Sequence, residues 1–560
     1  MGTVQNQNED FQDALKRAQI SWQQGNPQAA LEICARMDTI YQQHPDVLYL
    51  KGIICWSQKQ LEDALFFLHA ACEKGPTHWP DVHLVLGQVL RECGQLKQAK
   101  YWFERARQQD PTQAEVHYAL GMLYAEMGDL KAASHSLLQA CERQPLDWRY
   151  QTTRLFYLTA TPGLSHQERL QEFTSLASTQ LDLQAPLYPH FLNSRDPERK
   201  LRVAYVSADF RQHVAANSLS ALFELADRNH FELAAYSMVS QPDHLTLWFQ
   251  EHADIWRDCQ TWNDQQLLEQ LRRDQADILI DCSGYTFGNR LKVLAHKPAP
   301  IQLSAFGFIY TTGMRAIDYQ FTDSNAVPEH CAHWYSEDLI YLSSQMIWQA
   351  PSEEISVVSP PCLNQATGVT FGSGNASYKL NSDVILVWSR ILQAVPNSRL
   401  LLKHKRFELA DLQQHVRNIF AQQGISPERI QFRGASKHLE HLAFYNELDI
   451  ALDPFPYTGG ITTCETLYMG VPVISLDGEV TRTSIPVLKA VGADELIASD
   501  RESYVACAIH LAQSPQRLVD YRKELRKNLL ASPLLDKNLF VSEIETAYRD
   551  IWRAWCEETQ

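Results

Sequence analysis

The stretch DPFPYTGGITTCETLYMGVPVISL, residues 453–476, carries the clearest local signal in this chain. Gly459 and Gly460 remove side chains from a loop, which allows the backbone to approach another group closely. The run TTCETLYMG then has the pattern of an amphipathic helix, which Gly470 and Pro472 end. VPVISL has the pattern of a buried strand, so the stretch predicts a loop, a short helix and a strand in direct succession.

Two interpretations of this loop stay open on these residues alone. The first turn of a helix presents unpaired N–H groups and the positive end of the helix dipole, so Thr462 and Thr463 at that position favour a phosphate site. The order Thr462-Thr463-Cys464-Glu465 also fits the T-x-x-E capping box, which only closes a helix. The surrounding sequence has to decide between them.

The composition is that of a globular protein with several domains. The chain has 560 residues, of which 45% are hydrophobic and 21% charged, and its net charge is −16. This acidic balance argues against a nucleic-acid partner, which requires a basic face. No apolar run approaches the roughly 20 residues of a membrane span, and the polar start MGTVQNQNED does not resemble a signal peptide. The twelve cysteines lack metal-ligand spacing and read as reduced, buried thiols, so we expect a cytoplasmic protein without a metal site.

The first third of the chain repeats itself every 34 or 35 residues. Glycines recur at 52, 87 and 121, alanines at 64, 99 and 133, and prolines at 76, 111 and 145. Each unit contains two helical periods separated by a turn, and the small residues indicate where the two helices touch. The units resemble the tetratricopeptide repeat, so we expect an all-α solenoid over residues 1–150. Such an array can be a stacked spacer, but its concave face favours a groove for an acceptor protein or peptide.

After a linker at 151–197 that reads as helical, strands and helices alternate. LRVAYVS at 201–207 begins one alternating set and VTFGSG at 369–374 begins another, with the proline-rich break APSEEISVVSPPCLNQA before it. This rhythm predicts two doubly wound, Rossmann-like α/β domains, at 198–350 and at 351–560, the second with C-terminal helices. Ligands of such sheets bind at the carboxyl ends of the strands. G-x-G-x-x-G and Walker motifs are absent, which disfavours dinucleotide and ATP sites.

Polar residues follow five of the predicted strands. They are His213 after LRVAYVS, Asp281 and Tyr285 after DILI, Tyr378 and Lys379 after VTFGSG, Lys437 and His441 after IQFRG, and the glycine–threonine loop after DIALD. Each has an ordinary explanation, since His441 can be a helix-surface residue, Lys379 a solvated side chain and Asp281 a turn cap. Their shared position at strand ends favours a single site in a cleft instead.

Residues from about 200 to 555 resemble the catalytic region of the O-linked N-acetylglucosamine transferase and SPINDLY family. The resemblance is carried by LRVAYVSADFRQH, DCSGYTFGNR, KPAPIQ, SYKL and the stretch at 453–476, and a tetratricopeptide array precedes the catalytic region in that family as well. It implies a GT-B fold and inverting transfer of N-acetylglucosamine from UDP-GlcNAc to Ser or Thr hydroxyls of proteins. It also implies that the nucleotide sugar is the co-substrate and that no metal is required.

The resemblance implies a role for each matching residue. His213 or Asp281 would act as the base near the acceptor hydroxyl, and Lys379 would neutralise the leaving diphosphate. A lysine and a helix N-terminus can together replace Mg²⁺ in this chemistry. For the nucleotide sugar, the resemblance implies binding by Lys379, His441, Thr462, Thr463 and Glu465, with Glu465 at the ribose. Position at the strand ends adds Tyr378, Lys437, Gly459 and Gly460 to the expected nucleotide-sugar site.

Two departures from the family pattern keep other functions open. The animal enzymes carry a histidine before their paired threonines, where this chain has Gly460-Ile461, and Phe308-Ile309 replaces the family's aromatic–proline pair. The enzymatic alternatives are a SPINDLY-type O-fucosyltransferase that uses GDP-fucose, or another hexosyltransferase. A tetratricopeptide scaffold with an inactive GT-B region is a rival that intact Lys379 and His213 disfavour. A sugar-nucleotide epimerase would not explain the repeats.

Overall fold

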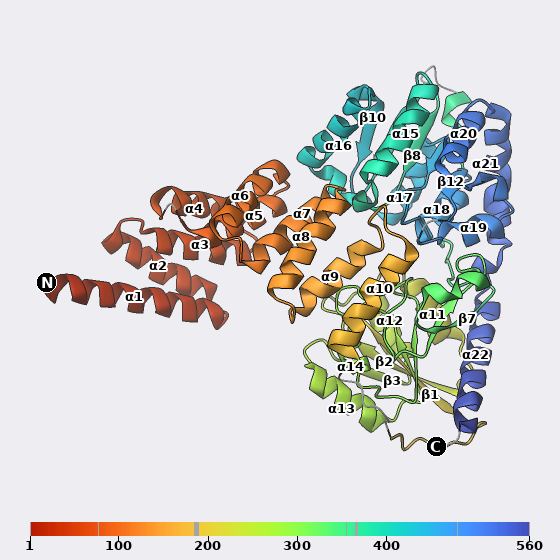
Figure 1. The fold of residues 1–560 in the computed structure, drawn as a ribbon, viewed down its shortest axis with the longest axis horizontal. Helices are drawn as coiled ribbons and strands as arrows, with labels where there is room; N and C mark the ends of the chain where they lie inside the picture. The colour runs from red at the N-terminus through yellow and green to blue at the C-terminus, as the bar shows by residue number, and fades with distance from the viewer. Residues whose placement is uncertain are drawn as a thin grey trace. The chain divides into compact units, whose positions relative to one another are not determined.

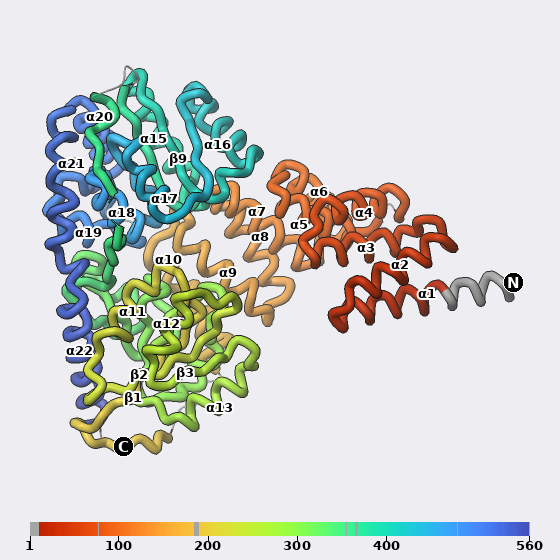
Figure 2. Tube along the Cα trace, turned by 180° about the vertical axis from the view of Figure 1, so that it is seen from behind, coloured from red at the N-terminus to blue at the C-terminus, as the bar shows by residue number. Residues whose placement is uncertain are grey.

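The computed structural model describes residues 2–76, 78–183, 190–353, 355–363, 368–478 and 480–558. The chain forms two compact units. The first comprises the residues up to Tyr150 together with Leu409–Val416, and the second comprises Gln151–Glu408 and the chain from Arg417 onward. Figures 1 and 2 show the helical first unit and the mixed α/β second unit from opposite sides.

The first unit is an all-helical array of antiparallel pairs, as the repeat pattern predicts. Its helices are α1 (Gly2–Gln23), α2 (Pro27–Tyr41), α3 (Pro45–Ser57), α4 (Leu61–Lys74), α5 (Pro80–Glu92), α6 (Leu96–Gln109), α7 (Ala114–Glu126) and α8 (Leu130–Arg143). The repeated glycines lie where the helices of a pair touch. A Cβ on Gly87 would stand 2.5 Å from the Phe103 ring, and one on Gly121 would stand 2.6 Å from Leu137 Cγ. Glycine is therefore needed at these places for close helix packing.

The linker predicted to be helical contains α9 (Trp148–Leu158) and α10 (His166–Leu176), followed by a π-helical turn at Ala177–Leu181. Phe173 of α10 packs edge-on against Tyr285 and Tyr310, with ring centroids 5.2 Å apart in both pairs. The linker is thus anchored through aromatic contacts to the loops that follow the strands of the first sheet.

The first sheet is fully parallel, with the strand order β3-β2-β1-β4-β5-β6-β7 over residues 201–341. Its strands are β1 (Leu201–Ser207), β2 (Phe231–Ser237), β3 (Ile255–Asp258), β4 (Ile278–Asp281), β5 (Ile301–Ser304), β6 (Tyr319–Thr322) and β7 (Asp338–Tyr341). The helices along this part of the chain are α11 (Ala216–Leu225), α12 (His244–His252), α13 (Asp264–Asp274) and α14 (Leu291–Leu294). The central strands read as continuous apolar runs because both faces of the sheet are covered.

The second sheet is also parallel, with the order β10-β9-β8-β11-β12-β13 over the described part of residues 370–498. Its strands are β8 (Thr370–Ser373), β9 (Arg399–Lys403), β10 (Ile430–Arg433), β11 (Ile450–Leu452), β12 (Val473–Leu476) and β13 (Ile497–Ala498). Its helices are α15 (Ser382–Ala394), α16 (Ala410–Gln422), α17 (His438–Phe444), α18 (Ile461–Tyr468), α19 (Ser484–Ala490), α20 (Arg501–Ala512) and α21 (Pro515–Leu530). We call each sheet with its helices a lobe.

The last helix, α22 (Lys537–Glu557), returns to the first lobe. Its residues Phe540, Ile544, Tyr548 and Trp552 belong to the same hydrophobic core as the strands of the first sheet. This corrects the sequence-based assignment of all residues from 351 to 560, C-terminal helices included, to the second domain. The chain therefore passes between the lobes twice, once after β7 and once before α22.

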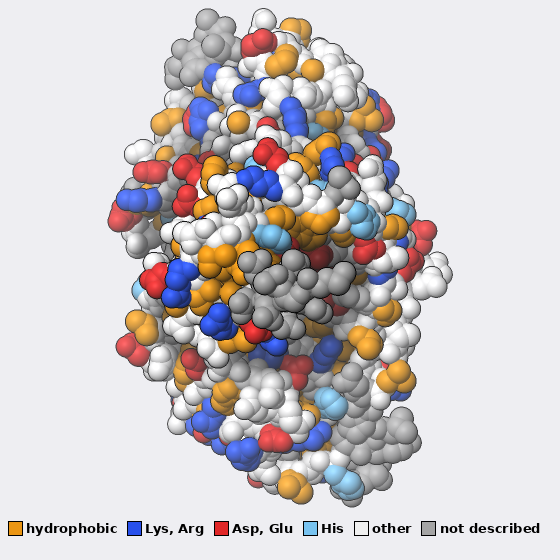
Figure 3. Space-filling model, turned by 90° about the vertical axis from the view of Figure 1, so that its left-hand side faces the viewer, with side chains coloured by type: hydrophobic (Ala, Val, Ile, Leu, Met, Phe, Trp, Pro, Cys, Tyr) orange, Lys and Arg blue, Asp and Glu red, His pale blue; other side chains and the backbone are white. Residues whose placement is uncertain are grey.

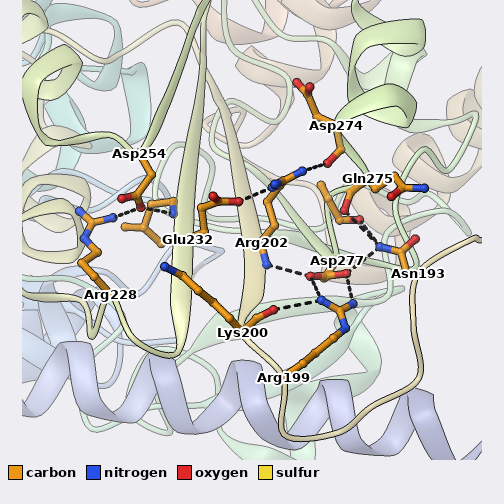
Figure 4. A network of polar contacts seen from close by, with 12 residues as sticks. Asn193, Arg199, Lys200, Arg202, Arg228, Glu232, Asp254, Asp274, Gln275 and Asp277 are labelled. Atoms are coloured by element: carbon orange, nitrogen blue, oxygen red, sulfur yellow. Dashed lines mark hydrogen bonds and ion pairs between the residues drawn. The ribbon is translucent and has the colours of Figure 1, made fainter.

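A polar network fixes the amino-terminal edge of the first sheet, opposite the strand ends that carry the predicted site residues (Figure 4). Asp277, which is 1% exposed, accepts hydrogen bonds from the Arg199 guanidinium at 2.8 Å and from the Arg202 backbone N–H at 2.8 Å. The Arg199 guanidinium also lies 4.5 Å from the centre of the Trp552 ring of α22. These contacts attach the chain before β1 to both the sheet and the last helix, which gives the network a structural role.

The surface charge and the helix hydropathy of the described residues agree with what the composition predicts. On the face shown in Figure 3, acidic and basic side chains alternate instead of forming a basic patch. Across the described residues, no helix combines the length and the apolar character that a membrane span requires.

Candidate active site

The site residues lie where the strand order of each sheet reverses. The order reverses between β1 and β4 in the first sheet and between β8 and β11 in the second. Loops that follow these strands diverge, which opens a crevice at their carboxyl ends. Lys379 follows β8 and the glycine–threonine loop follows β11, while His213 follows β1 and Asp281 ends β4.

A cavity of about 250 Å³ is lined by residues of both lobes at these strand ends. The second lobe contributes Lys379 and Thr462, together with Gly460 of the loop before α18. The first lobe contributes mainly apolar side chains, among them Phe306 and Phe308. A mostly apolar wall with a few convergent polar groups is typical of a small-molecule site.

Asn375 brings Lys379 and Thr462 together. Its Oδ1 accepts a hydrogen bond from Lys379 Nζ at 3.1 Å and lies 3.4 Å from the Thr462 hydroxyl, which donates to it. The Lys379 ammonium also donates to the Thr458 carbonyl oxygen at 2.9 Å. Two of its three N–H donors are thus used to orient it, and the third remains for a ligand.

The charge of Lys379 is set by its surroundings. Burial lowers the pKa of the ammonium to about 8, and the carboxylate of Asp453 opposes this shift. The ammonium lies 4.4 Å from the centre of the Tyr457 ring, a cation–π contact. Lys379 therefore carries its positive charge at neutral pH and can stabilise an anion in the cavity.

Asp453 shapes the loop before α18. Its side chain is 1% exposed and accepts hydrogen bonds from the Gly459 N–H and the Ser475 hydroxyl, both at 2.8 Å. A Cβ on Gly459 would stand 2.6 Å from Thr463 Oγ1 and 2.8 Å from Thr462 Oγ1, so a side chain there would displace both hydroxyls. A Cβ on Gly460 would meet no atom closer than 3.7 Å. Close backbone approach is therefore a property of Gly459 in particular.

The capping-box interpretation of this loop is wrong. The residue before α18 is Gly460, which makes no side-chain cap, and Glu465 instead contacts His441. The hydroxyl of Thr463, which is 2% exposed, has no hydrogen-bond partner among the described residues. The first turn of α18 thus presents free N–H groups and a buried hydroxyl, as an anion site requires.

His441 and Glu465 pair with each other beside this loop. His441 Nε2 lies 3.2 Å from Glu465 Oε2, and the two side chains are 24% and 10% exposed. Neither is among the residues that line the 250 Å³ cavity. Their roles at the nucleotide and the ribose stay predictions.

His213 lies in an adjoining cavity of about 370 Å³ in the first lobe. Its Nδ1 is 3.5 Å from Asp209 Oδ2, and the next residue, Val214, lines the 250 Å³ cavity. Burial lowers the pKa of His213, although the Asp209 carboxylate raises it. A neutral imidazole beside a carboxylate can accept a proton, so the geometry suits a base.

The other predicted site residues have structural surroundings. Asp281 is 1% exposed and accepts hydrogen bonds from the backbone N–H groups of Ser283 and Gly284, at 3.2 and 2.8 Å, which is the turn cap that the sequence also allowed. Burial raises its pKa to about 6. The Tyr378 ring packs against Tyr157 of α9 at 5.7 Å, and Lys437 is exposed at the start of α17. None of Asp281, Tyr378 and Lys437 is among the described residues that line the 250 Å³ cavity.

Sequence reasoning missed Asn375, Asp453 and Asp209. Asn375 reads as an ordinary turn residue in GNAS, although its position four residues before Lys379 is a usable signal. Asp453 stands directly after β11, and Asp209 stands just after β1 and four residues before His213. Both follow strand ends, where a polar side chain is a candidate site residue, so the same rule that found Lys379 could have found them. Among the described residues, no three His, Cys, Asp or Glu side chains gather as a metal ion would need.

Two doubly wound lobes, with a lysine and a free helix N-terminus in the cavity at their strand ends, define a glycosyltransferase of the GT-B type. A family model described as glycosyl transferase family 41 matches residues 165–349 and 363–544, and tetratricopeptide models match residues 21–89 and 114–145. The chain belongs to glycosyl transferase family 41.

Individual relatives agree with this assignment. The chain is 37% identical over 378 residues to a probable UDP-N-acetylglucosamine–peptide N-acetylglucosaminyltransferase SPINDLY of Petunia hybrida, covering 66% of this chain and 40% of that protein. It is 31% identical over 376 residues to the corresponding probable enzyme SEC of Arabidopsis thaliana, covering 65% and 38%. The chain thus spans about two fifths of the length of these curated relatives.

A solved structure shares the whole architecture. A point mutant of the Thermobaculum terrenum O-GlcNAc transferase superposes with a TM-score of 0.80 at 28% identity, and the match covers 98% of each chain. The repeats and both lobes are therefore arranged along that chain in the same order as in this one.

Proposed function

We propose that this protein transfers N-acetylglucosamine from UDP-GlcNAc to Ser or Thr hydroxyls of proteins, with inversion at the sugar carbon. The SPINDLY and SEC relatives are named as transferring N-acetylglucosamine from UDP-N-acetylglucosamine to peptides, and the Thermobaculum relative is named as an O-GlcNAc transferase, which supports this proposal. The observation that carries the proposal is the link between Lys379 Nζ and Thr462 Oγ1 through Asn375 Oδ1, at 3.1 and 3.4 Å. It favours binding of a diphosphate between the lysine and the start of α18.

In the proposed reaction the leaving UDP gains negative charge as the glycosidic bond breaks. Lys379 and the N-terminus of α18 stabilise that charge, and because they are fixed beforehand they need no reorganisation. These two groups supply the positive charge that Mg²⁺ supplies in many transferases, so we propose that the reaction is independent of metal.

His213 is the proposed base that takes the proton of the acceptor hydroxyl. Burial lowers its pKa, which favours the neutral imidazole that a base requires, and Nδ1 accepts the Ala215 backbone N–H at 3.4 Å. The Asp209 carboxylate, 3.5 Å from Nδ1, stabilises the ring once it is protonated. The contacts of Asp281 to a turn support a structural role for that carboxylate instead.

The repeat array is the proposed binding groove for the acceptor protein, because stacked helix pairs expose a long concave face. The cytoplasm is the proposed location. All twelve cysteines are free thiols, which supports a reducing compartment.

The donor is tested by thermal unfolding and transfer assays with UDP-GlcNAc, UDP, GDP-fucose and GDP. We expect UDP-GlcNAc and UDP to raise the unfolding temperature, and mass spectrometry to find N-acetylhexosamine on Ser or Thr of lysate proteins, in EDTA as well as in Mg²⁺. Stabilisation and transfer with GDP-fucose alone would contradict the proposal and favour the O-fucosyltransferase alternative.

Catalysis is tested by Lys379→Ala, with Lys489→Ala, an exposed lysine of the same lobe, as the matched control. Removal of a charge that acts mainly in the transition state is expected to lower kcat about 100-fold or more, while the control keeps wild-type activity. Full activity of a folded Lys379→Ala variant would remove this lysine from the mechanism.

A further inference from the structure

Gln320 is a buried polar residue at the first-lobe side of the 250 Å³ cavity. It lies on β6, its side chain is 3% exposed, and its Oε1 has no hydrogen-bond partner among the described residues. A buried amide oxygen without a partner is costly. Among the described residues that line the cavity, Gln320 is the one with such an atom, so a ligand in the cavity can bond to it.

The sheet fixes the direction of this side chain. Gln320 is in register with Ser304 of β5, and Ser304 with Asp281 of β4. In-register residues of parallel strands point to the same face, so the three side chains form a polar row on one face of the sheet. Gln320 is the member of this row that lines the cavity. Rotation of Gln320 to the other face would require a change of strand register.

The other polar groups of the cavity are engaged or face solvent. The Ser218 hydroxyl accepts the N–H of Ile347 at 3.3 Å, and the Thr483 hydroxyl donates to the Gly459 carbonyl oxygen at 2.7 Å. Gln345, the second glutamine of the cavity, is only half-buried. Lys379 and Thr462 line the cavity from the second lobe, where the diphosphate is proposed to bind. The same cavity is lined from the first lobe by Gln320, so a sugar attached to that diphosphate and bound in the cavity can contact it.

We propose that Gln320 is a specificity-determining residue that selects the donor sugar through a hydrogen bond. This inference rests on the proposed function. Its Oε1 accepts a donor of the sugar, which is either the acetamido N–H or a ring hydroxyl. A site built around such a bond rejects a sugar that lacks the partner group, because the amide oxygen is then left unpaired.

The test uses the full chain with Gln320→Met, which keeps the length of the side chain but removes the amide. Transfer kinetics are measured with UDP-GlcNAc and UDP-glucose, and the affinity for UDP alone is measured by calorimetry. We expect kcat/KM for UDP-GlcNAc to fall about 10- to 100-fold, while the Kd for UDP changes less than about twofold. If the bond goes to the acetamido group, the preference for UDP-GlcNAc over UDP-glucose collapses; if it goes to a hydroxyl, both donors lose equally.

Gln302→Met is the matched control, because Gln302 of β5 is another buried glutamine of the same sheet with an unpartnered Oε1 but does not line the cavity. It is expected to keep the wild-type sugar preference and kcat/KM. If Gln302→Met behaves like Gln320→Met, or if UDP affinity falls as much as kcat/KM, the assignment to Gln320 is wrong. Thermal unfolding checks that the variants fold. Gln320→Thr, which has a side chain suited to a strand, replaces Gln320→Met if that variant does not fold, and the same results are expected of it. Wild-type protein that does not use UDP-GlcNAc would overturn the proposed function together with this inference, whereas an active wild type and an unchanged Gln320→Met overturn the inference alone.

Discussion

At the scale of single residues, the site is prepared before a ligand arrives. Asn375 Oδ1 and the Thr458 carbonyl oxygen hold the Lys379 ammonium, and Asp453 holds the N–H of Gly459. Charges and dipoles that are already oriented act on a developing negative charge without the cost of reordering them. The buried carboxylate of Asp453 also keeps the lysine charged although burial opposes it.

The pH dependence of the reaction follows from Lys379. Because burial lowers its pKa to about 8, the free enzyme loses the positive charge as the pH rises through this value. We expect kcat/KM for the donor to decrease above about pH 8, toward tenfold per unit, because kcat/KM reports the free enzyme. Activity that stays level to pH 10 would contradict this.

The same pKa shift has a consequence for stability. The unfolded chain has the ordinary lysine pKa of about 10.4 and binds more protons than the folded chain between pH 8 and that value, so stability rises with pH in this window. Below pH 8 the charged lysine lowers stability. Lys379→Met is therefore expected to unfold at a higher temperature than the wild type at pH 7, yet to gain less from added UDP.

Gly459 and Gly460 offer a matched pair of substitutions. Gly459→Ala is expected to weaken UDP binding at least about 10-fold, because its Cβ would stand 2.6 and 2.8 Å from the two threonine hydroxyls. Gly460→Ala is expected to cost much less, since its Cβ would meet nothing closer than 3.7 Å. Calorimetric titration with UDP decides this, and equal losses in both variants would contradict the geometry.

Strand ends made part of the site predictable from sequence. Lys379 and Thr462 follow apolar runs that end abruptly, and the structure places both at one cavity. Gln320 could not be found in this way, because it lies inside β6 and only the folded structure places it at the cavity. Asp281 was predicted as a site residue from its strand end, but its carboxylate accepts the Gly284 N–H and so caps the following turn instead.

At the scale of elements, α22 closes the hydrophobic core of the first lobe. Trp552 is fully buried, and its Nε1 donates to the Asp196 carbonyl oxygen at 3.0 Å. The amphipathic pattern of residues 537–557 indicates a helix that covers a core, but periodicity does not say which core. This is why sequence alone placed α22 with the second domain, whereas β1, a continuous apolar run, was predicted with the bounds that the structure gives it.

Trp552→Ala is expected to lower the free energy of unfolding of the first lobe by about 3–5 kcal/mol, through lost burial and the cavity left behind. Leu539→Ala on the same helix is the control, because Leu539 is 37% exposed and its truncation is expected to cost about 0.5 kcal/mol or less. Urea unfolding followed by tryptophan fluorescence and circular dichroism measures both. A Trp552→Ala variant as stable as the control would show that α22 is not part of this core.

At the scale of the whole molecule, the chain divides into two compact units, and the proposed site lies entirely in the second. The repeat period and the change to alternating strands made this order of folds predictable from sequence. A ligand stabilises only the folded part that binds it. We therefore expect calorimetry to resolve two unfolding transitions, with UDP raising the temperature of one.

Gly87→Ala identifies the other transition. Its Cβ would stand 2.5 Å from the Phe103 ring, so the substitution is expected to lower the transition of the repeat unit and to leave the UDP-dependent transition and the Kd for UDP unchanged. Gly25→Ala, where a Cβ would meet nothing within 4 Å but the backbone φ is +81°, separates steric overlap from backbone strain. A shift of both transitions by Gly87→Ala would contradict independent unfolding.

The double passage of the chain between the lobes, after β7 and before α22, limits how they can move. Two lobes connected at two points rotate most freely about the line that joins those points, which acts as a hinge axis. If the proposed transferase opens to admit its donor and release the nucleotide, we expect the motion to be a rotation about this line. A substitution that stiffens either crossing segment is then expected to slow both donor binding and nucleotide release. The turnover rate would in that case report the rate of the lobe rotation.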